Sequence, residues 1–211
     1  MARLKIFTFP DAVLTQIALP LQRVEKEHQK WAEDMLETMY FAPGIGLAAN
    51  QVGLLQRLLV LDIEYELDEV KDRAKASKAE KVAGQIITNK KPIVLLNPRI
   101  ILREGQVVTE EGCLSVPDYN AEVKRAKKLK VEYQDLDGLT KTLSAEDLLA
   151  VVIQHEIDHL DGKLFIDRLG PLKKEFAKKK LKQDRVFRDE EDRMGVFDPG
   201  FEQASRHKKG L

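Results

Sequence analysis

The sequence predicts an α+β fold, because its helical and strand-like segments are segregated along the chain and do not alternate. A helical pattern covers residues 24–39, with Trp31, Met35 and Met39 as inward side chains. The β-rich segments follow this helix, and an Asp137-Gly138 turn precedes the last of them. They lie at residues 57–63, 93–102, 105–108, 128–135 and 139–143. At 211 residues, the chain is long enough for one domain with a real core.

The composition excludes several classes of protein. Lys plus Arg and Asp plus Glu each number 35, so no global charge favours nucleic acid or membranes, and we expect no specific DNA binding. No segment approaches the roughly 20 apolar residues of a membrane span, and no basic start runs into an apolar stretch. We therefore expect a cytoplasmic protein. With one cysteine, an intramolecular disulfide is impossible, and the thiol is free for metal or nucleophilic chemistry or is a small buried hydrophobe.

A second helix is predicted directly after the last β-rich segment. Ser144 and Asp147 resemble a capping box, and the nearly continuous apolar run at 148–153 indicates a helix buried on most sides. Gly162 is a plausible signal for its end. This burial pattern fits poorly with a surface helix that carries incidental histidines.

The run Gln-His-Glu-Ile-Asp-His at 154–159 lies on this second helix. His155 and His159 are four residues apart, so both imidazoles lie on one face and can reach the same ion. Glu156 lies about 100° round the helix from His155, near the ion without having to ligate it. That arrangement is typical of metal-assisted hydrolysis with a carboxylate as general base.

The lone cysteine lies in Glu-Gly-Cys-Leu-Ser at 111–115. Gly112 and Pro117 indicate a strand edge or turn that presents Cys113. Together with two histidines, Cys113 would give three protein ligands and leave a fourth position to water, as in catalytic metal sites. Two alternatives remain open, namely an inert buried cysteine and a nucleophile with a histidine base.

A segment of small residues, Gly-Ile-Gly-Leu-Ala-Ala-Asn-Gln, covers 44–51. It lacks the Lys-Ser/Thr of a phosphate loop and the spacing of a dinucleotide fingerprint. Small residues here would let a substrate backbone approach, and Gln51 could donate an amide N–H to a developing oxyanion. The alternative is a tight packing site between a helix and a loop.

Together, GIGLAANQ, EGCLS and QHEIDH resemble the three signature motifs of peptide deformylases, in the same order. The resemblance covers roughly residues 5 to 170. It implies antiparallel sheets packed around a central helix that carries the HExxH motif. We therefore expect a catalytic domain at 1–170, with a charged insertion at about 64–91, and a charged, partly helical extension at 171–211.

The resemblance also implies a reaction and its residues. Cys113, His155 and His159 would ligate one divalent metal, with Fe2+ as the usual native ion and Zn2+, Ni2+ or Co2+ as substitutes. A metal-bound water would attack the formyl group of N-formylmethionyl peptides and release formate. Glu156 would move the protons, while the Gln51 amide and the Leu114 backbone N–H would stabilise the oxyanion.

The substrate would bind as an extended strand. The backbone groups that would pair with it belong to Ile45, Gly46 and Gly112. The apolar slot for methionine would be lined by Ile45, Leu148, Val151 and Val152. The chain departs from the family pattern at Ala12 and Thr15, and Asn120 replaces an arginine of some members, which puts contact with downstream substrate residues in doubt.

Two charged segments lie outside the motifs. For the insertion at 64–91 we expect a mobile loop or a short solvated helix, with least order at 71–81; a partner site is the alternative. In the extension, a lysine cluster precedes an acidic run at 189–192. Some bacterial deformylases dock on the ribosome through a C-terminal helix. The cluster could act likewise, or it could be a solvated tail.

Two other functions compete with the main one. A zincin-type endopeptidase would also use HExxH, but its downstream third ligand has no convincing counterpart here. A catalytically idle, ribosome-associated binding module is the other alternative. Retention of Gln51, Cys113, His155, Glu156 and His159 together argues against it.

Overall fold

The computed structural model describes residues 3–69, 81–82 and 85–193, and it confirms the α+β class. The main sheet has five antiparallel strands in the order β1-β2-β6-β9-β10. These strands are β1 (Gly46–Ala48), β2 (Leu58–Leu61), β6 (Ile93–Glu104), β9 (Lys128–Gln134) and β10 (Thr140–Glu146). Every residue of β2 is buried, because β2 lies between two other strands and helices pack against it.

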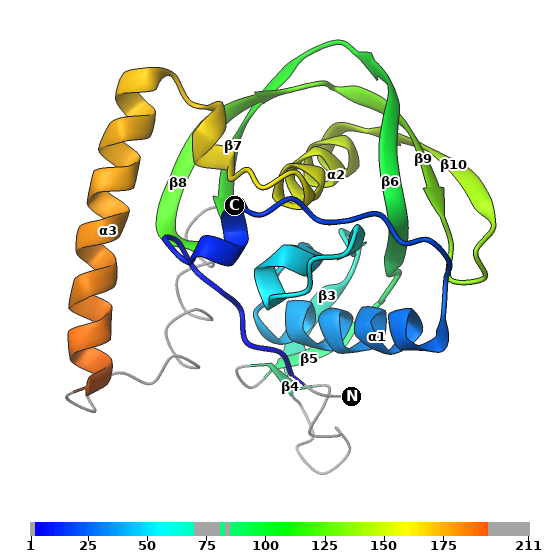
Figure 1. Cartoon of the computed structure of the whole chain (residues 1–211), viewed down its shortest axis with the longest axis horizontal. Helices are drawn as coiled ribbons and strands as arrows, with labels where there is room; N and C mark the ends of the chain where they lie inside the picture. The colour runs from blue at the N-terminus through cyan, green and yellow to red at the C-terminus, as the bar shows by residue number, and fades with distance from the viewer. Residues whose placement is uncertain (1–2, 70–80, 83–84, 194–211) are drawn as a thin grey trace.

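Helix α2 (Asp147–Leu160) lies in the middle of the molecule, as the resemblance implied (Figure 1). It contacts β1, β2, β9 and β10, and each of its residues from Ala150 onward is buried. The predicted capping box is wrong. Ser144 belongs to β10, where it pairs with Lys130 of β9, and the helix begins three residues later without a side-chain cap. Gly162 follows the helix with a φ of +69°, which confirms it as the signal for the end.

Helix α1 (Lys26–Phe41) covers the sheet from below in Figure 1 and contacts β1 and β2. It lies two residues later than predicted. Met35 and Met39 are fully buried in the main core, as expected, whereas Trp31 is only partly buried.

A second sheet of two antiparallel strands, β7 (Val107–Cys113) and β8 (Val116–Arg125), ends in the turn that carries Cys113. Strand β8 was not predicted, because Pro117 lies within it. The ladder is irregular at this point: the Cys113–Val116 pair is followed by Glu111–Ala121. The missing N–H of Pro117 therefore falls where the regular pairing is interrupted.

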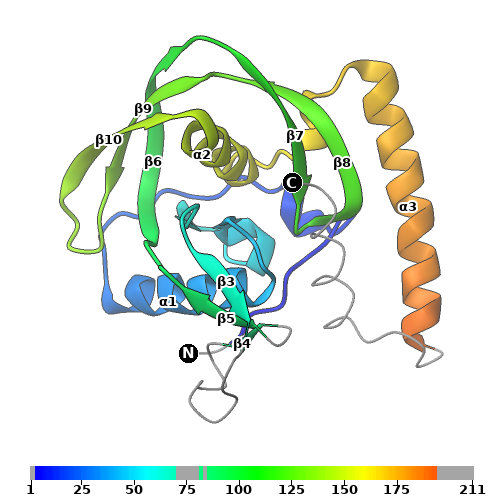
Figure 2. The same ribbon diagram turned by 180° about the vertical axis from the view of Figure 1, so that it is seen from behind.

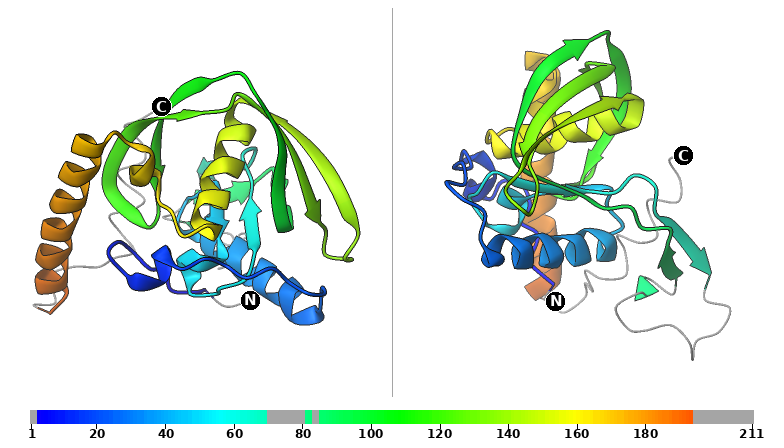
Figure 3. Two further views of the ribbon diagram at one scale, coloured as in Figure 1. Left: turned by 45° about the horizontal axis from the view of Figure 1, so that its top comes forward. Right: turned by 90° about the vertical axis from the view of Figure 1, so that its right-hand side faces the viewer.

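The insertion forms a small sheet, so the expectation of a loop or helix is wrong at both of its ends. Its strands are β3 (Glu66–Glu69), β4 (Lys81–Val82) and β5 (Gln85–Thr88), in the order β3-β5-β4. This sheet projects from the body in Figure 2 and in the right-hand view of Figure 3. The side chain of Ile87, on β5, is buried in the main core. Most of the stretch expected to be least ordered, 70–80, lies outside the described residues.

A single buried carboxylate closes the base of this insertion. Asp62 Oδ1 accepts the backbone N–H groups of Glu64 and Tyr65 at 3.0 and 3.2 Å. Its Oδ2 accepts the Tyr40 hydroxyl and the backbone N–H of Lys91, both at 2.7 Å. Asp62 is completely buried, so the two ends of the insertion are held together inside the protein.

Helix α3 (Pro171–Arg193) confirms the expected C-terminal helix and stands beside β8 (Figure 1, Figure 3). Ala177 and Leu181 belong to a second apolar core that also includes Val116, Val123 and Phe165. The remainder of the extension, from 194, lies outside the described residues. Among the helices of the part that the structure describes, none is both long and apolar enough to cross a membrane.

Candidate metal centre

Three side chains from the second and third motifs meet in the interior. Cys113 lies at the end of β7, while His155 and His159 lie on successive turns of α2. Each residue offers one ligand atom, and these atoms all lie within 4.8 Å of one another. His159 Nε2 is 3.2 Å from Cys113 Sγ, and both histidines are buried. The structure therefore brings together the three residues expected to hold a metal.

The first motif reaches the same place through Gln51, on the 3-10 helix η2 (Ala49–Val52). Gln51 Oε1 accepts the Ala48 N–H at 2.8 Å. Its Nε2 lies 3.1 Å from Ser115 Oγ and 3.6 Å from Cys113 Sγ. Because the oxygen accepts this N–H, the amide is held with its N–H groups toward Ser115 and Cys113.

Glu156 is packed directly against the small residues of the first motif. A Cβ atom at Gly46 would lie 2.4 Å from Glu156 Oε1, so only glycine leaves room for this carboxylate. The other oxygen, Oε2, is buried and has no hydrogen-bond partner among the described residues. Burial raises the pKa of Glu156 to about 7, against the lowering effect of His155.

The two histidines differ in their electrostatic surroundings. Burial lowers the pKa of His155, but Cys113 and Glu111 outweigh burial and raise it above its ordinary value. Burial and the neighbouring His155 lower the pKa of His159, which favours the neutral ring that a metal needs. The ring of His155 also stacks on Phe165, with a centroid distance of 6.0 Å.

Glu111 holds His155 from behind, a role that sequence analysis missed. Its Oε2 lies 2.9 Å from His155 Nδ1, and both of its oxygens accept N–H groups of Arg125, at 2.7 and 2.8 Å. Burial raises the pKa of Glu111, but these partners outweigh it and bring the pKa to about 2. A sequence signal was present, because Glu111 is a carboxylate only two residues before Cys113 on the same strand.

The chain of charges continues away from the metal centre. Arg125 donates to Asp158 Oδ2 at 2.5 Å, and Arg168, on the 3-10 helix η4 (Phe165–Arg168), binds both oxygens of Asp158. Arg125 and Asp158 are almost completely buried.

These side chains fit a metal ion. A thiolate and two imidazoles suit zinc, iron, nickel or cobalt better than magnesium or calcium. The second ring nitrogen of His155 is held by a carboxylate, which is a common arrangement around metal-bound histidines.

The residues expected to bind the substrate differ in exposure. Ile45 and Leu148 are 38% and 50% exposed, while Val151 and Val152 are buried. Gly46 adjoins Glu156, and a Cβ at Gly112 would lie 2.7 Å from Asn120 Oδ1.

The sequence profile of the family described as polypeptide deformylase matches residues 3–175. The chain belongs to the polypeptide deformylase family. The family that the three motifs indicated is thus confirmed, and with it the expectation of a hydrolase.

Relatives within the family cover most of the chain. A peptide deformylase of Bartonella tribocorum is 44% identical, over 84% of this chain and 90% of the relative. Peptide deformylase 2 of Xanthomonas campestris is 45% identical, over 86% of this chain and 95% of the relative.

Solved deformylase structures share the fold. The crystal structure from Legionella pneumophila has a TM-score of 0.72 and 39% identity, over 90% of this chain and 98% of that chain. A structure from Ehrlichia chaffeensis in complex with actinonin has a TM-score of 0.72 and 33% identity, over 87% of this chain and 98% of that chain.

Proposed function

We propose that Cys113, His155 and His159 hold one divalent metal ion, and that the chain there hydrolyses the N-terminal formyl group of formyl-methionyl peptides. The observation that carries this proposal is the convergence of all three ligand atoms within 4.8 Å, with Gln51 and Glu156 beside them. When bound, such an ion acidifies water and polarises the formyl oxygen. Release of formate and a free methionyl amine completes the reaction.

Glu156 is the general base and acid of this proposal. It takes a proton from the attacking water and returns it to the departing amine. Burial raises the pKa of Glu156 above its ordinary value, which makes the carboxylate a better proton acceptor than an exposed glutamate. Its second oxygen has no partner among the described residues, so it is free to contact the water.

The Gln51 amide and the Leu114 backbone N–H stabilise the oxygen of the formyl group as it gains negative charge. Two observations support the role of Gln51: its amide is oriented by Ala48, and its nitrogen faces Cys113. Leu114 follows Cys113 directly in the sequence, which supports this role for its backbone N–H.

The peptide substrate pairs with backbone groups of Ile45, Gly46 and Gly112, as an added strand. Support comes from β1, which lies at the edge of the main sheet with one side unpaired among the described strands. Ile45, Leu148, Val151 and Val152 line the slot for methionine.

For the metal we propose Fe2+ in the cell, with Zn2+, Ni2+ and Co2+ able to replace it. Softness of the ligands favours this group of ions but does not choose among them. Metal analysis after anaerobic purification checks the assignment, and zinc as the only metal in active protein would contradict it.

We further propose that residues 1–170 are the catalytic unit and that the protein works in the cytoplasm, where nascent chains emerge. We also propose that the extension at 171–211 contacts the ribosome. On α3, Lys174 and Lys178 pair with the body, whereas Lys173, Lys179 and Lys182 are exposed and open to phosphates. Truncation after Gly170 should reduce co-sedimentation with ribosomes at low salt. Unchanged co-sedimentation would contradict this contact.

Formate release from formyl-Met-Ala-Ser tests the main proposal. We expect turnover by metal-loaded protein, its loss with a chelator, and recovery when Fe2+, Ni2+ or Co2+ is added back. An intact internal peptide should not be cleaved, which separates this activity from an endopeptidase. Absence of chelator-sensitive formate release from loaded protein would overturn it.

A further inference from the structure

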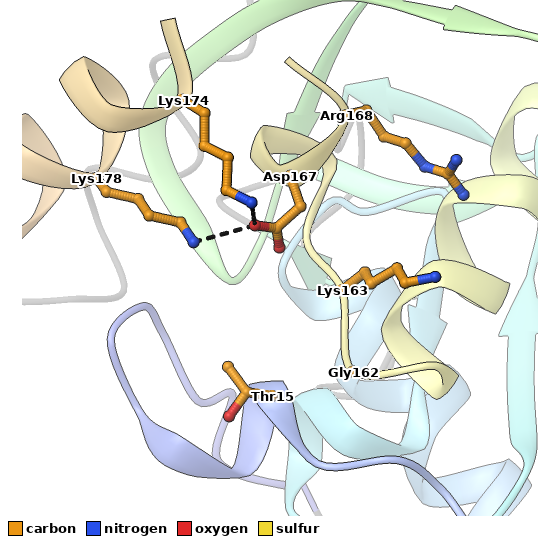
Figure 4. A pocket seen from close by; sticks show the side chains of 7 residues that line it. All are labelled: Thr15, Gly162, Lys163, Asp167, Arg168, Lys174 and Lys178. Carbon is orange, nitrogen blue, oxygen red and sulfur yellow. Dashed lines mark ion pairs between the residues drawn. The ribbon is translucent and has the colours of Figure 1, made fainter. Parts of the chain in front are cut away.

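An open pocket of about 530 Å³ lies where α3 meets the body (Figure 4). Its walls come from four segments that are separate in the sequence: the 3-10 helix η1 (Ala12–Thr15), the turn after α2, η4 and the first turns of α3. The residues that line it are Thr15, Gly162, Lys163, Asp167, Arg168, Lys174 and Lys178. None of them belongs to the metal centre.

The charge in this pocket is strongly positive. Four of the lining side chains are cationic and only Asp167 is anionic. Asp158, which lies behind Arg168 and binds it, balances one further charge. Two positive charges therefore remain without a counter-charge on the walls.

Asp167 does not cancel the field of the two lysines of α3. Its Oδ1 contacts Lys174 Nζ at 2.9 Å and Lys178 Nζ at 3.0 Å, as Figure 4 shows. Its Oδ2 accepts the Leu164 N–H at 3.0 Å. Two ammonium groups thus share a single carboxylate oxygen, and each retains donors for another anion.

Lys163 adds a positive charge that takes part in no ion pair among the described residues, and it is exposed. Arg168 is held by Asp158, yet its side chain is 45% exposed on the pocket wall. A guanidinium in this state can still donate to phosphate oxygens.

We propose that this pocket binds a small polyvalent anion of the phosphate class, such as a phosphorylated metabolite. The volume is within the usual range of small-molecule sites, and Lys and Arg side chains are the usual partners of phosphate oxygens. A bound anion would contact both α3 and the segment after α2. It would therefore hold the C-terminal helix more firmly against the body.

The binding test uses zinc-loaded full-length protein, with inorganic phosphate and fructose 1,6-bisphosphate as probes. Phosphorus NMR and calorimetry should show saturable binding of both anions. Lys163→Met should weaken binding at least tenfold, because it removes the unpaired ammonium. Lys124→Met is the matched control, since Lys124 is exposed on β8 outside the pocket, and it should leave the affinity unchanged.

Equal affinity in the two variants, absence of saturation at millimolar concentrations, or binding of an RNA oligonucleotide alone would overturn the proposal. A second measurement uses thermal unfolding: millimolar phosphate should raise the Tm of the natural protein more than that of Lys163→Met, because binding to the folded state stabilises it. An equal rise in both proteins would count against the site, because phosphate also stabilises proteins without a binding site. Both readouts are independent of deformylase turnover, so a failure here and a failure of the catalytic proposal are distinguishable.

Discussion

Glu111 Oε2 lies 2.9 Å from Nδ1 of His155, on the side of the ring away from Cys113. The carboxylate fixes the orientation of the ring and makes its other nitrogen a better ligand. Glu111 is therefore a positioning residue for His155 in the proposed metal centre.

We predict that Glu111→Gln weakens metal binding by about 10- to 100-fold, the usual cost of losing such a partner. Competition with a chromophoric chelator measures the affinity directly. Glu110→Gln is the matched control, because Glu110 is exposed on the same strand and should bind metal normally. Equal affinities in the two variants would argue that His155 is oriented by packing alone.

Glu156→Ala should retain the metal and lose turnover by roughly 10²–10⁴-fold, the usual contribution of a general base. Metal content and formate release are measured on the same preparation. Glu175→Ala, an exposed glutamate of α3, is expected to behave as the natural protein. Undiminished turnover in Glu156→Ala would show that Glu156 is not the general base.

Gly46→Ala should reduce turnover by roughly 100-fold while metal content stays the same, because a misplaced catalytic group carries a cost of this order. The added Cβ would lie 2.4 Å from Glu156 Oε1 and would displace that carboxylate. Gly170→Ala is the control, since no atom lies within 4 Å of its added Cβ. If both variants were equally active, Glu156 would have to be more mobile than its burial indicates.

Arg125→Met should lower the free energy of unfolding by about 3–5 kcal/mol, because it leaves Glu111 and Asp158 buried without their shared partner. Urea unfolding of the zinc-loaded protein gives the value. Arg99→Met breaks an exposed pair with Glu132 and should change stability by no more than about 1 kcal/mol. Similar losses of unfolding free energy in the two variants would show that the buried ion pairs of Arg125 contribute no more to stability than an exposed pair.

The stability of α3 against the body should depend on pH through Asp167. Burial raises the pKa of Asp167, but the Leu164 N–H, Lys174 and Lys178 outweigh it, so the pKa lies below the ordinary value of 3.8. The stabilisation is therefore complete above that value and is lost as the pH falls through the lower, folded pKa. The stability difference between the natural protein and Asp167→Asn should be constant from neutral pH down to about 5, and shrink below 3.8. A difference that shrank already near neutral pH would contradict this assignment.

The metal centre was readable from the sequence because its chemistry is local. Four residues separate His155 from His159, so helix geometry alone places both rings on one face, and the structure bears this out. The contacts of Gln51 with Cys113 and Ser115 join segments more than 60 residues apart. Only the resemblance to a family could indicate those contacts in advance.

Other features depended on tertiary context. The Ser144 capping box failed because the strand before α2 uses that residue for pairing. Strand β8 was hidden by Pro117, whose cost vanishes at an irregular pair. The pairing of Glu111 and Asp158 through Arg125 was not predictable, because nothing in a linear sequence shows which buried charges meet.

Asp62 has a consequence for how this family member can vary. Asp62 binds the backbone of Glu64 and Tyr65 at one end of the insertion and of Lys91 at the other. The two ends are therefore held at a fixed short distance, which does not depend on the length of the chain between them. Apart from Leu67 and Ile87, which pack in or against the main core, the excursion can lengthen, shorten or change sequence while β2 and β6 keep their register. It is thus the natural place on this enzyme to graft a tag or reporter, provided that Asp62 itself is left untouched.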